Sequence, residues 1–531
     1  TSTYDDVYNL TGVTDRQGAT YSYTYDNNQN QLAAIENATG KTVSFGYSSR
    51  GLLSQATNAN GGSESYSYDA VGNLSQQQDS VASQNFTTTY AYTPRDQMKT
   101  VTKGSDTTSF SYDPDGNLAS KAYPNGVNTS YGYDANGRLT AQQAAKSGQS
   151  LQSFTQAYDA NSNITLLTEA AGATSYSYDS LNRLTNENLA AHGNIAYTYD
   201  KTGNRTTKTE PAPTGGPVLA LSLTRIYWAS YTDWQNHQLS IDYKVTDNGP
   251  GTAYATKITG ATATNGVYLT SPVPVSLGNI NQGSYAPFTF KYYIPVGVTS
   301  FSATVYSTCS DQNGAGYSFP AKRTSYSYNQ ANQLTTGYDY QGVSTSYAYD
   351  ANGAITQKSD GASTTGYAYN GMDKLTEVTT PTTAVNYSYD ALGRRISRTE
   401  GTNTASYHHD AKSDLTDYET NAGGNLTASY QRGADGLISQ TDYTGQSPVT
   451  SYDLYNPHGD TSALTNASGA VTGTYRYDSF GNPIGANNLV DGYTGKWQRE
   501  KDSSTGTIRM GVREYDPVLG RFVSADPLKG S

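Results

Sequence analysis

The sequence has little of what a membrane span or a disulfide-linked domain requires. Cys309 is the only cysteine among 531 residues, so no disulfide can form within the chain. Hydrophobic residues make up 35%, below the share of about 45–50% usual in globular domains. No apolar run approaches the roughly 18 residues that a membrane-spanning helix needs. A signal peptide is not visible, because Thr1 already lies in repeat-like sequence, and we expect the chain to be an internal piece of a longer protein.

Basic charge is also scarce. The net charge is −11 and the isoelectric point is about 4.9. Binding to a nucleic-acid backbone needs clustered lysine and arginine, so a nucleic-acid partner is excluded. The acidic balance favours solubility, and a basic partner is the alternative.

Tyrosine and glycine are abundant, with 49 and 52 copies, and the tyrosines belong to a repeat. Its copies begin roughly 20 to 25 residues apart, a period that is typical of an array in which each unit covers the next. The best copies are YSYDAVGNLSQ (66–76), FSYDPDGNLAS (110–120), YGYDANGRLTA (131–141), YSYDSLNRLTN (176–186), YAYDANGAITQ (347–357) and YSYDALGRRIS (387–397).

One copy predicts a β-hairpin. Tyr66 and Tyr68 are two residues apart, so they share one face of a strand. Asp69 favours the first position of a turn, because its carboxylate can accept hydrogen bonds from backbone N–H groups further on. Gly72 supplies the positive φ that closes the turn, and Asn73 and Leu74 open the return strand. Helical periodicity is hard to find anywhere, so the fold class is all-β.

The strand faces alternate tyrosine with serine, threonine and alanine instead of large aliphatic residues. Tyrosine rings can join strands by cross-strand contacts, each contributing about 0.2–1 kcal/mol. We therefore expect a single-layer curved sheet, wet on both sides, that either extends as a ribbon or closes around a cavity.

The repeat stops between Tyr199 and Tyr328, which indicates an insert. We expect a first repeat region at 1–210, an inserted β-sandwich of about seven strands at 211–322 and a second repeat region at 323–451. The stretches at 245–255 and 276–297 resemble immunoglobulin-like modules of bacterial surface and adhesion proteins. An unrelated β insertion is the alternative.

The remaining part, 452–531, carries the most specific motif. REYDPVLGRFVSADP, from Arg513 to Pro527, closely resembles the conserved core of the rearrangement-hotspot (RHS) family of YD-repeat proteins, and the upstream repeats agree with it. The resemblance implies a β-strip wound into a spiral, hollow shell. In bacterial members this shell encloses a C-terminal toxin, and the core acts as an inward-curling plug and a self-cleaving aspartyl protease. In animal relatives a similar shell belongs to a cell-surface adhesion receptor.

The chain departs from the family pattern at its end. The second, DPxGL-like motif where family members are cleaved is absent before Ser531. Asp516 and Asp526 match family aspartates, and Arg513 and Arg521 match family arginines. An aspartyl dyad needs two carboxylates that share a proton, and no second partner can be placed. We therefore assign no catalytic residue, expect an incomplete protease, and interpret these four residues as plug-forming turns and ion pairs.

Other candidates are weak. His408-His409-Asp410 lacks the further ligands of a metal site and is interpreted as an exposed strand end. The loops 113–117 and 134–137 lack the spaced ligands of a calcium loop and are interpreted as ordinary turns. Glycosylation sequons recur within the repeat's own turn at Asn73, Asn163, Asn204 and Asn425. No metal, cofactor or cofactor-binding residue is predicted.

These observations predict a secreted or cell-surface, non-catalytic shell around a C-terminal effector that this chain lacks. The alternative is an adhesive or structural surface protein without cargo. The predicted partners are the chain's own C-terminal cargo or neighbouring surface proteins, with carbohydrate as a third candidate, because exposed tyrosines stack on sugar rings.

Overall fold

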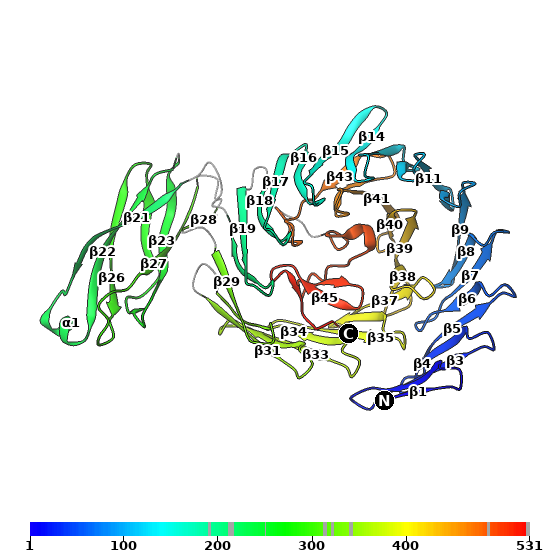
Figure 1. Ribbon diagram of the computed structural model, residues 1–531, viewed down its shortest axis with the longest axis horizontal. Coiled ribbons are helices and arrows are strands. Elements are labelled where there is room, and N and C mark those ends of the chain that lie inside the picture. Colours follow the sequence, from blue (N-terminus) through cyan, green and yellow to red (C-terminus); the bar gives the residue numbers. More distant parts are fainter. Residues whose placement is uncertain are drawn as a thin grey trace. The chain divides into compact units, whose positions relative to one another are not determined.

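The computed structural model describes residues 1–189, 193–210, 217–249, 251–311, 316–319, 323–338, 343–485 and 489–526. The chain divides into two compact units. Unit 1 comprises Thr1–Gln156, Ala348–Lys358 and Ser363–Ser531, and unit 2 comprises Ala157–Tyr347 and Ser359–Ala362. Both are built almost entirely of antiparallel strands, which confirms the all-β prediction (Figure 1).

Unit 1 contains two runs of strands that pair in sequence order. The first run is β1 (Ser2–Tyr4), β2 (Leu10–Thr14), β3 (Thr20–Tyr25), β4 (Gln31–Glu36), β5 (Lys41–Tyr47), β6 (Leu53–Thr57), β7 (Ser63–Tyr68), β8 (Leu74–Val81), β9 (Gln84–Tyr92), β10 (Met98–Lys103), β11 (Asp106–Tyr112), β12 (Leu118–Ala122), β13 (Val127–Tyr133), β14 (Leu139–Lys146) and β15 (Gln149–Tyr158). The second run is β32 (Ile355–Ser359), β33 (Thr364–Tyr369), β34 (Leu375–Thr379), β35 (Ala384–Tyr389), β36 (Arg395–Glu400), β37 (Asn403–His409), β38 (Thr416–Asn421), β39 (Leu426–Gly433), β40 (Gly436–Asp442), β41 (Val449–Tyr455), β42 (Thr461–Thr465) and β43 (Val471–Thr474).

The hairpin turn follows the prediction. Asp69 Oδ1 accepts the backbone N–H groups of Val71, Gly72 and Asn73 at 2.8–3.0 Å, and its Oδ2 accepts the Asn73 side-chain amide. Gly72 has φ +105°, and β8 begins at Leu74, one residue later than predicted, because Asn73 still belongs to the turn. At the equivalent turn of Asp200, the hydrogen bond from the Asn204 side chain, with those from Thr202 and the backbone, lowers the pKa of the carboxyl to about 2.

The second tyrosine of the repeat joins successive hairpins. The Tyr68 hydroxyl donates to the Leu53 carbonyl at 2.7 Å, and Tyr92 does the same to Leu74 at 2.9 Å. Each acceptor opens the return strand of the preceding hairpin. The same bond joins Tyr112 to Met98, Tyr133 to Leu118, Tyr389 to Leu375 and Tyr455 to Leu437 in unit 1, and Tyr178 to Ile164 and Tyr199 to Leu184 in unit 2.

The two runs of unit 1 lie against each other along a seam, and β10 contacts β39 directly (Figure 1). Hydrogen bonds join Tyr23 to Ala391, Asn60 to Ile396, Gln77 to Asp417, Tyr123 to Asp453 and Asn125 to Thr465. The residue numbers of the bonded partners increase along both runs, so the two runs meet in the same sequence order. The expectation of a sheet wet on both sides is wrong here, because the second run covers the first and buries Val101, Tyr123 and Ile438.

Unit 2 carries hairpin strands and the inserted sheets. The hairpin strands are β16 (Ile164–Glu169), β17 (Gly172–Tyr178), β18 (Leu184–Leu189), β19 (Gly193–Tyr199), β20 (Arg205–Thr209), β29 (Arg323–Tyr328), β30 (Leu334–Tyr338) and β31 (Ser344–Tyr349). Strand β20 pairs with β29, so the repeat resumes beside the strand where it stopped.

The insert forms two four-stranded sheets, β21-β22-β26-β24 and β25-β23-β27-β28, around a core that includes Ile241, Ile258 and Phe290. Its elements are β21 (Leu219–Tyr227), α1 (Tyr231–Gln235), β22 (Gln238–Asp247), β23 (Ala253–Ala263), β24 (Tyr268–Leu269), β25 (Val275–Ile280), β26 (Tyr285–Tyr293), β27 (Ala303–Ser310) and β28 (Gly316–Phe319). Cys309 is buried, and burial raises its thiol pKa to about 12. The expected limits of the insert, 211 and 322, lie outside the described residues, and the immunoglobulin likeness stays a prediction.

Candidate functional site at the docked C-terminal segment

The segment 489–526 folds onto the second run of unit 1 (Figure 1). It contains the 3-10 turn η1 (Gly495–Trp497) and a three-stranded sheet of β44 (Ile508–Met510), β45 (Arg513–Asp516) and β46 (Arg521–Phe522). We call it the docked segment. Three anchors hold it: a turn at η1 and two clusters of ion pairs.

The first anchor uses backbone groups and a glycine. The side-chain amide of Gln498 donates to the Thr416 carbonyl at 2.9 Å and accepts the Thr416 N–H at 3.1 Å. It therefore satisfies both backbone groups of one residue of β38. The Trp497 ring lies where a side chain at Gly459 would be, and Gly459 has φ +94°. This position therefore favours glycine for two reasons, the lack of space for a side chain and the left-handed backbone.

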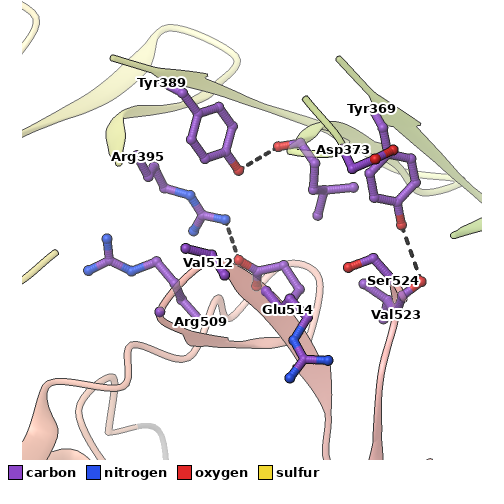
Figure 2. Close-up of a pocket in the computed structure, with 12 residues that line it drawn as sticks. Tyr369, Asp373, Tyr389, Arg395, Arg509, Val512, Glu514, Val523 and Ser524 are labelled. Atoms are coloured by element: carbon purple, nitrogen blue, oxygen red, sulfur yellow. Dashed lines mark hydrogen bonds and ion pairs between the residues drawn. The ribbon is translucent and has the colours of Figure 1, made fainter. Parts of the chain in front are cut away.

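The second anchor is a buried ion pair between Arg395 on β36 and Glu514 on β45 (Figure 2). Both side chains are at most 5% exposed. The other Glu514 oxygen accepts the Thr507 hydroxyl at 3.0 Å, and the Arg395 guanidinium lies 3.9 Å from the centre of the Tyr387 ring. The space between the two layers here is about 10 Å³, enough for about one water molecule, so this is a packed joint and not a ligand pocket.

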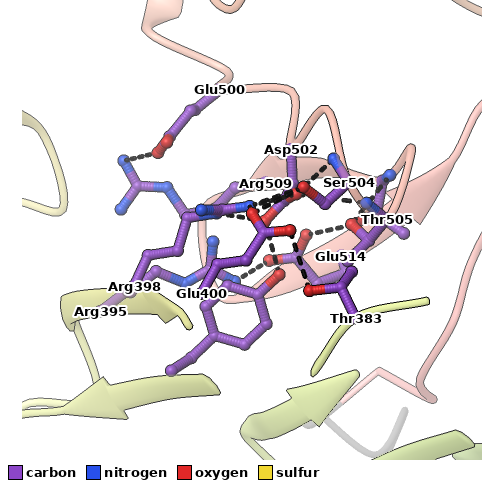
Figure 3. Close-up of polar contacts among 12 residues, drawn as sticks. Thr383, Arg395, Arg398, Glu400, Glu500, Asp502, Ser504, Thr505, Arg509 and Glu514 are labelled. Carbon is purple, nitrogen blue, oxygen red and sulfur yellow. Dashed lines mark hydrogen bonds and ion pairs between the residues drawn. The ribbon is translucent and has the colours of Figure 1, made fainter. Parts of the chain in front are cut away.

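The third anchor centres on Asp502 (Figure 3). Arg398 binds its two oxygens at 2.7 and 3.0 Å, and Tyr387 donates its hydroxyl at 2.7 Å. Burial alone would raise the pKa of Asp502, but the bonds from Arg398 and Tyr387 outweigh burial and lower it. Glu400 extends the network, because it accepts Arg398 and Ser504 at 2.8 Å each. Two-point pairs of this kind are the stronger charge-assisted hydrogen bonds.

Beside these anchors lies a group of carboxylates that are buried but have few hydrogen-bond donors or cations to stabilise their negative charge. Burial raises the pKa of Asp453 to about 8, and burial also raises the pKa of Glu419 and Asp491. Glu500 accepts the Tyr407 hydroxyl at 3.0 Å and lies 3.7 Å from Arg509. Among the described residues, Asp453 Oδ2 has no hydrogen-bond partner. Asp453, Glu419 and Asp491 can therefore hold protons near neutral pH.

Within the described part of the chain, no group of three or more histidine, cysteine or acidic side chains could hold a metal ion. In the same residues, no helix has the length and apolar character needed to cross a membrane. The ion pairs Arg395–Glu514 and Arg398–Asp502 make the site a joint between two layers of one chain.

Comparison with known proteins agrees with this architecture. The family model for the Teneurin YD-shell matches residues 299–529, which includes the second run and the docked segment. The RHS Repeat model matches residues 47–84, 112–149 and 158–193.

The chain belongs to the RHS family of YD-repeat proteins.

Curated relatives match a short part of this YD-repeat chain. The tRNA3(Ser)-specific nuclease WapA of Bacillus spizizenii is 34% identical over 117 residues, and the tRNA nuclease WapA of Bacillus subtilis is 32% identical over 117 residues. The match covers 22% of this chain and 5% of each relative. Among solved structures, TcdB2-TccC3 without its hypervariable C-terminal region is similar over 99% of this chain and 30% of that chain, at 14% identity and a TM-score of 0.35.

The four residues that match the RHS core lie within or next to the three-stranded sheet of the docked segment. Asp516 Oδ1 accepts the N–H groups of Val518 and Leu519 at 2.9 and 3.0 Å, so it closes the β45–β46 turn. Arg521 pairs with Asp516 in the strand register, and Arg513 forms an ion pair with Asp526 at 3.2 Å. The two aspartates thus have different partners. Pro527, the last residue of the motif, lies outside the described residues.

The interpretation of the histidine pair as an exposed strand end is wrong. His408 and His409 are 5% and 0% exposed in β37. His409 occupies the position of the second repeat tyrosine, and its Nε2 lies 2.7 Å from the Arg395 carbonyl. This is the acceptor position that the tyrosine hydroxyl uses in other copies. Burial lowers the pKa of His409 to about 3, so the ring is neutral.

The loops 113–117 and 134–137 form the same aspartate turns as the other copies of the repeat. Asp113 accepts the N–H of Asn117 at 2.8 Å, and Asp134 accepts the N–H groups of Asn136 and Arg138. The sequon residues share this role. The side-chain amides of Asn73, Asn163 and Asn204 donate to the turn aspartate of their own hairpin at 2.9–3.1 Å.

Sequence reasoning missed Arg395, Arg398, Gln498 and Asp502, although one signal was present. The return strand of most copies opens with an aliphatic residue, as at Leu74, whereas YSYDALGRRIS opens it with Arg395. A charge at this apolar position is a signal of another partner, but Arg205 opens β20 in the same way, so the charge does not by itself identify the copy that binds the docked segment. The partner itself, Glu514, is 119 residues away and has no local signature.

Proposed function

We propose that this chain is the non-catalytic wall of a secreted or surface-displayed RHS protein, and that the wall encloses a C-terminal effector not present in these 531 residues. The observation that carries the proposal is the docking of segment 489–526 through buried arginine–carboxylate pairs. A segment anchored in this way would bring whatever follows it in the protein against the covered face of the sheet. Family membership supports the same role.

The seam supports a wound strip. Two runs that meet in the same sequence order, with partners such as Tyr23–Ala391 and Asn125–Thr465, are what successive turns of a spiral would produce. The wall would act by exclusion, keeping the effector from its substrate until release. Asp516 and Asp526 serve in this proposal as structural residues of the docked segment. Carbohydrate binding has no support from the comparisons and is not proposed.

Limited proteolysis of the complete gene product tests the proposal. If the wall encloses an effector, the sequence beyond Ser531 resists protease in the native protein and is digested once the wall is unfolded in urea. The control is a double variant, Arg395→Leu with Arg398→Leu, which removes both ion-pair anchors and should expose that sequence. Equal digestion of the native and unfolded proteins would contradict enclosure.

The alternative function is adhesion at the cell surface without cargo. The exposed aromatic residues on the insert, such as Trp234 at 53% exposure, favour it. In that case the gene product ends in a wall or membrane anchor, and no protected fragment is found.

A further inference from the structure

One end of the insert gathers exposed aromatic and aliphatic side chains. We call this end the aromatic tip: Trp228, Tyr231, Trp234, Tyr268 and Val296 are 41, 71, 53, 54 and 83% exposed, respectively. Two of the three tryptophans of the chain lie here. We propose that the aromatic tip docks on the interfacial region of a lipid bilayer. The inference is independent of the proposed enclosure of an effector.

Strand pairing brings these residues to one end of the two sheets. Tyr268 pairs with Tyr293 at the end of β26, and Gln238 at the start of β22 pairs with the same residue. The Ile294 N–H bonds to His237, which places the Val296 loop beside α1. Figure 1 shows α1 at one end of the inserted sheets. The tip is the end opposite to Leu219, where β21 begins beside Asp247.

Helix α1 is rigidly held although it adds nothing to the core. All five of its residues are at least partly exposed. Ser230 caps its first turn through the Asp233 N–H at 3.0 Å, and Lys291 on β26 binds Asp233 at 3.0 Å. Tyr231 and Trp234 stack at 5.5 Å between ring centres. A short helix fixed in this way presents large rings to solvent, which costs free energy in water and indicates a binding role.

The chemistry of the tip favours lipid over other partners. Tryptophan and tyrosine prefer the headgroup level of a bilayer, where the ring is buried and the polar atom stays wet. Val296, the most exposed of the five, suits the acyl-chain boundary just below the headgroups. A sugar would stack on the aromatic faces but would gain nothing from an exposed valine. Asp233 is neutralised by Lys291, so the helix carries no unbalanced charge that headgroups would repel. Binding therefore needs no anionic lipid.

Flotation of the full chain with phosphatidylcholine vesicles tests the proposal. We expect the chain to float with these neutral vesicles, and raising NaCl from about 0.1 to about 0.5 M to change the bound fraction by less than about twofold. The double variant Trp234→Ser with Val296→Asp should lower the bound fraction by about tenfold or more. Leu223→Ser is the matched control, because Leu223 is also 53% exposed but lies mid-strand in β21, and it should bind as the parent chain does.

A second measurement needs no variant. Brominated phosphatidylcholine should quench part of the tryptophan fluorescence of the parent chain, because Trp228 and Trp234 enter the bilayer while Trp497 stays in the docked segment. Circular dichroism checks that the variants keep their fold. The proposal is overturned if the parent chain fails to float, if tip variants float equally, if only anionic vesicles bind and salt releases them, or if bromine leaves the fluorescence unchanged. Capture of a glycan or a protein without lipid binding would likewise assign the tip to another partner.

Discussion

At the scale of single residues, the tyrosine hydroxyl does more than the sequence indicates. The repeat predicts which tyrosines share a strand face and that each hydroxyl needs a partner. The structure supplies that partner as a backbone carbonyl of the preceding hairpin, as in Tyr455 to Leu437. The acceptor is a main-chain atom that every residue type carries, so no sequence pattern could have identified it. The aspartate turn, in contrast, could be predicted because all its partners lie within four residues.

This bond gives a direct prediction. Tyr455 is 5% exposed, and Tyr455→Phe keeps the ring while leaving the Leu437 carbonyl without its donor. We expect a loss of about 1–2 kcal/mol in the free energy of unfolding, measured by urea titration. Tyr8→Phe is the control, because Tyr8 is 88% exposed and its change should stay within about 0.5 kcal/mol. Equal effects of the two changes would show that the interhairpin bond does not contribute.

At the scale of elements, the hairpins are local and the docked segment is not. Asp69, Gly72 and Leu74 specify a hairpin within a few residues, so the sequence predicts the hairpin and places the start of its return strand to within one residue. The docked segment depends on contacts such as Arg395 to Glu514, which the chain brings together over a long separation. The family motif predicted that this segment would form turns and ion pairs, but not which strand would receive it.

Restoring the repeat at Arg395 should weaken docking. Arg395→Leu gives this copy the aliphatic residue of its neighbours but leaves the Glu514 carboxylate buried without its cation. Breaking a buried pair in this way costs about 3–5 kcal/mol. Hydrogen exchange of residues 489–526 should rise sharply, and the urea midpoint should fall.

The double variant Arg395→Leu with Glu514→Leu separates the pair from its packing. We expect it to recover much of the lost stability, since replacing both charges with apolar groups removes the unpaired carboxylate. Arg499→Gln is the control, because the Arg499–Asp414 pair is 28% and 40% exposed and should contribute little. If Arg395→Leu leaves exchange in the segment unchanged, the pair is not an anchor.

At the scale of unit 1 as a whole, acidic side chains are buried along the seam between the two runs. Glu64 accepts Tyr66 and Asn58, and burial raises its pKa to about 8. Burial also raises the pKa of Asp79 and Asp410, which line one cavity together with Lys103 and Arg432. The cations packed there are Lys103 on β10, Arg432 on β39 and Arg394 beside β36. Of these three cations, Arg432 is already paired with Asp417 and Arg394 with Asp390. The three carboxyls are therefore under-compensated, and the seam is most stable when some of them keep their protons.

The stability of unit 1 should therefore fall as the pH rises from about 6.5 to about 8. A carboxyl with a raised pKa binds its proton more tightly in the folded state than in the unfolded chain, where its pKa is near 4. Its stabilisation is present at acid pH and is lost as the pH rises through the folded value, which is about 8 for Glu64 and for Asp453. Each such group contributes a slope of about 1.4 kcal/mol per pH unit. His408 and His409, whose pKa values burial lowers, oppose this trend only below their ordinary value near 6.5.

Urea unfolding across this range, monitored by hydrogen exchange in β7 and β37, measures the slope. Glu64→Gln should reduce the slope of unfolding free energy against pH by the contribution of one carboxyl. Asp6→Asn, a change at an exposed turn, should leave that slope unchanged. A stability that rises with pH over this range would show that the seam carboxyls are ionised and compensated in the folded protein.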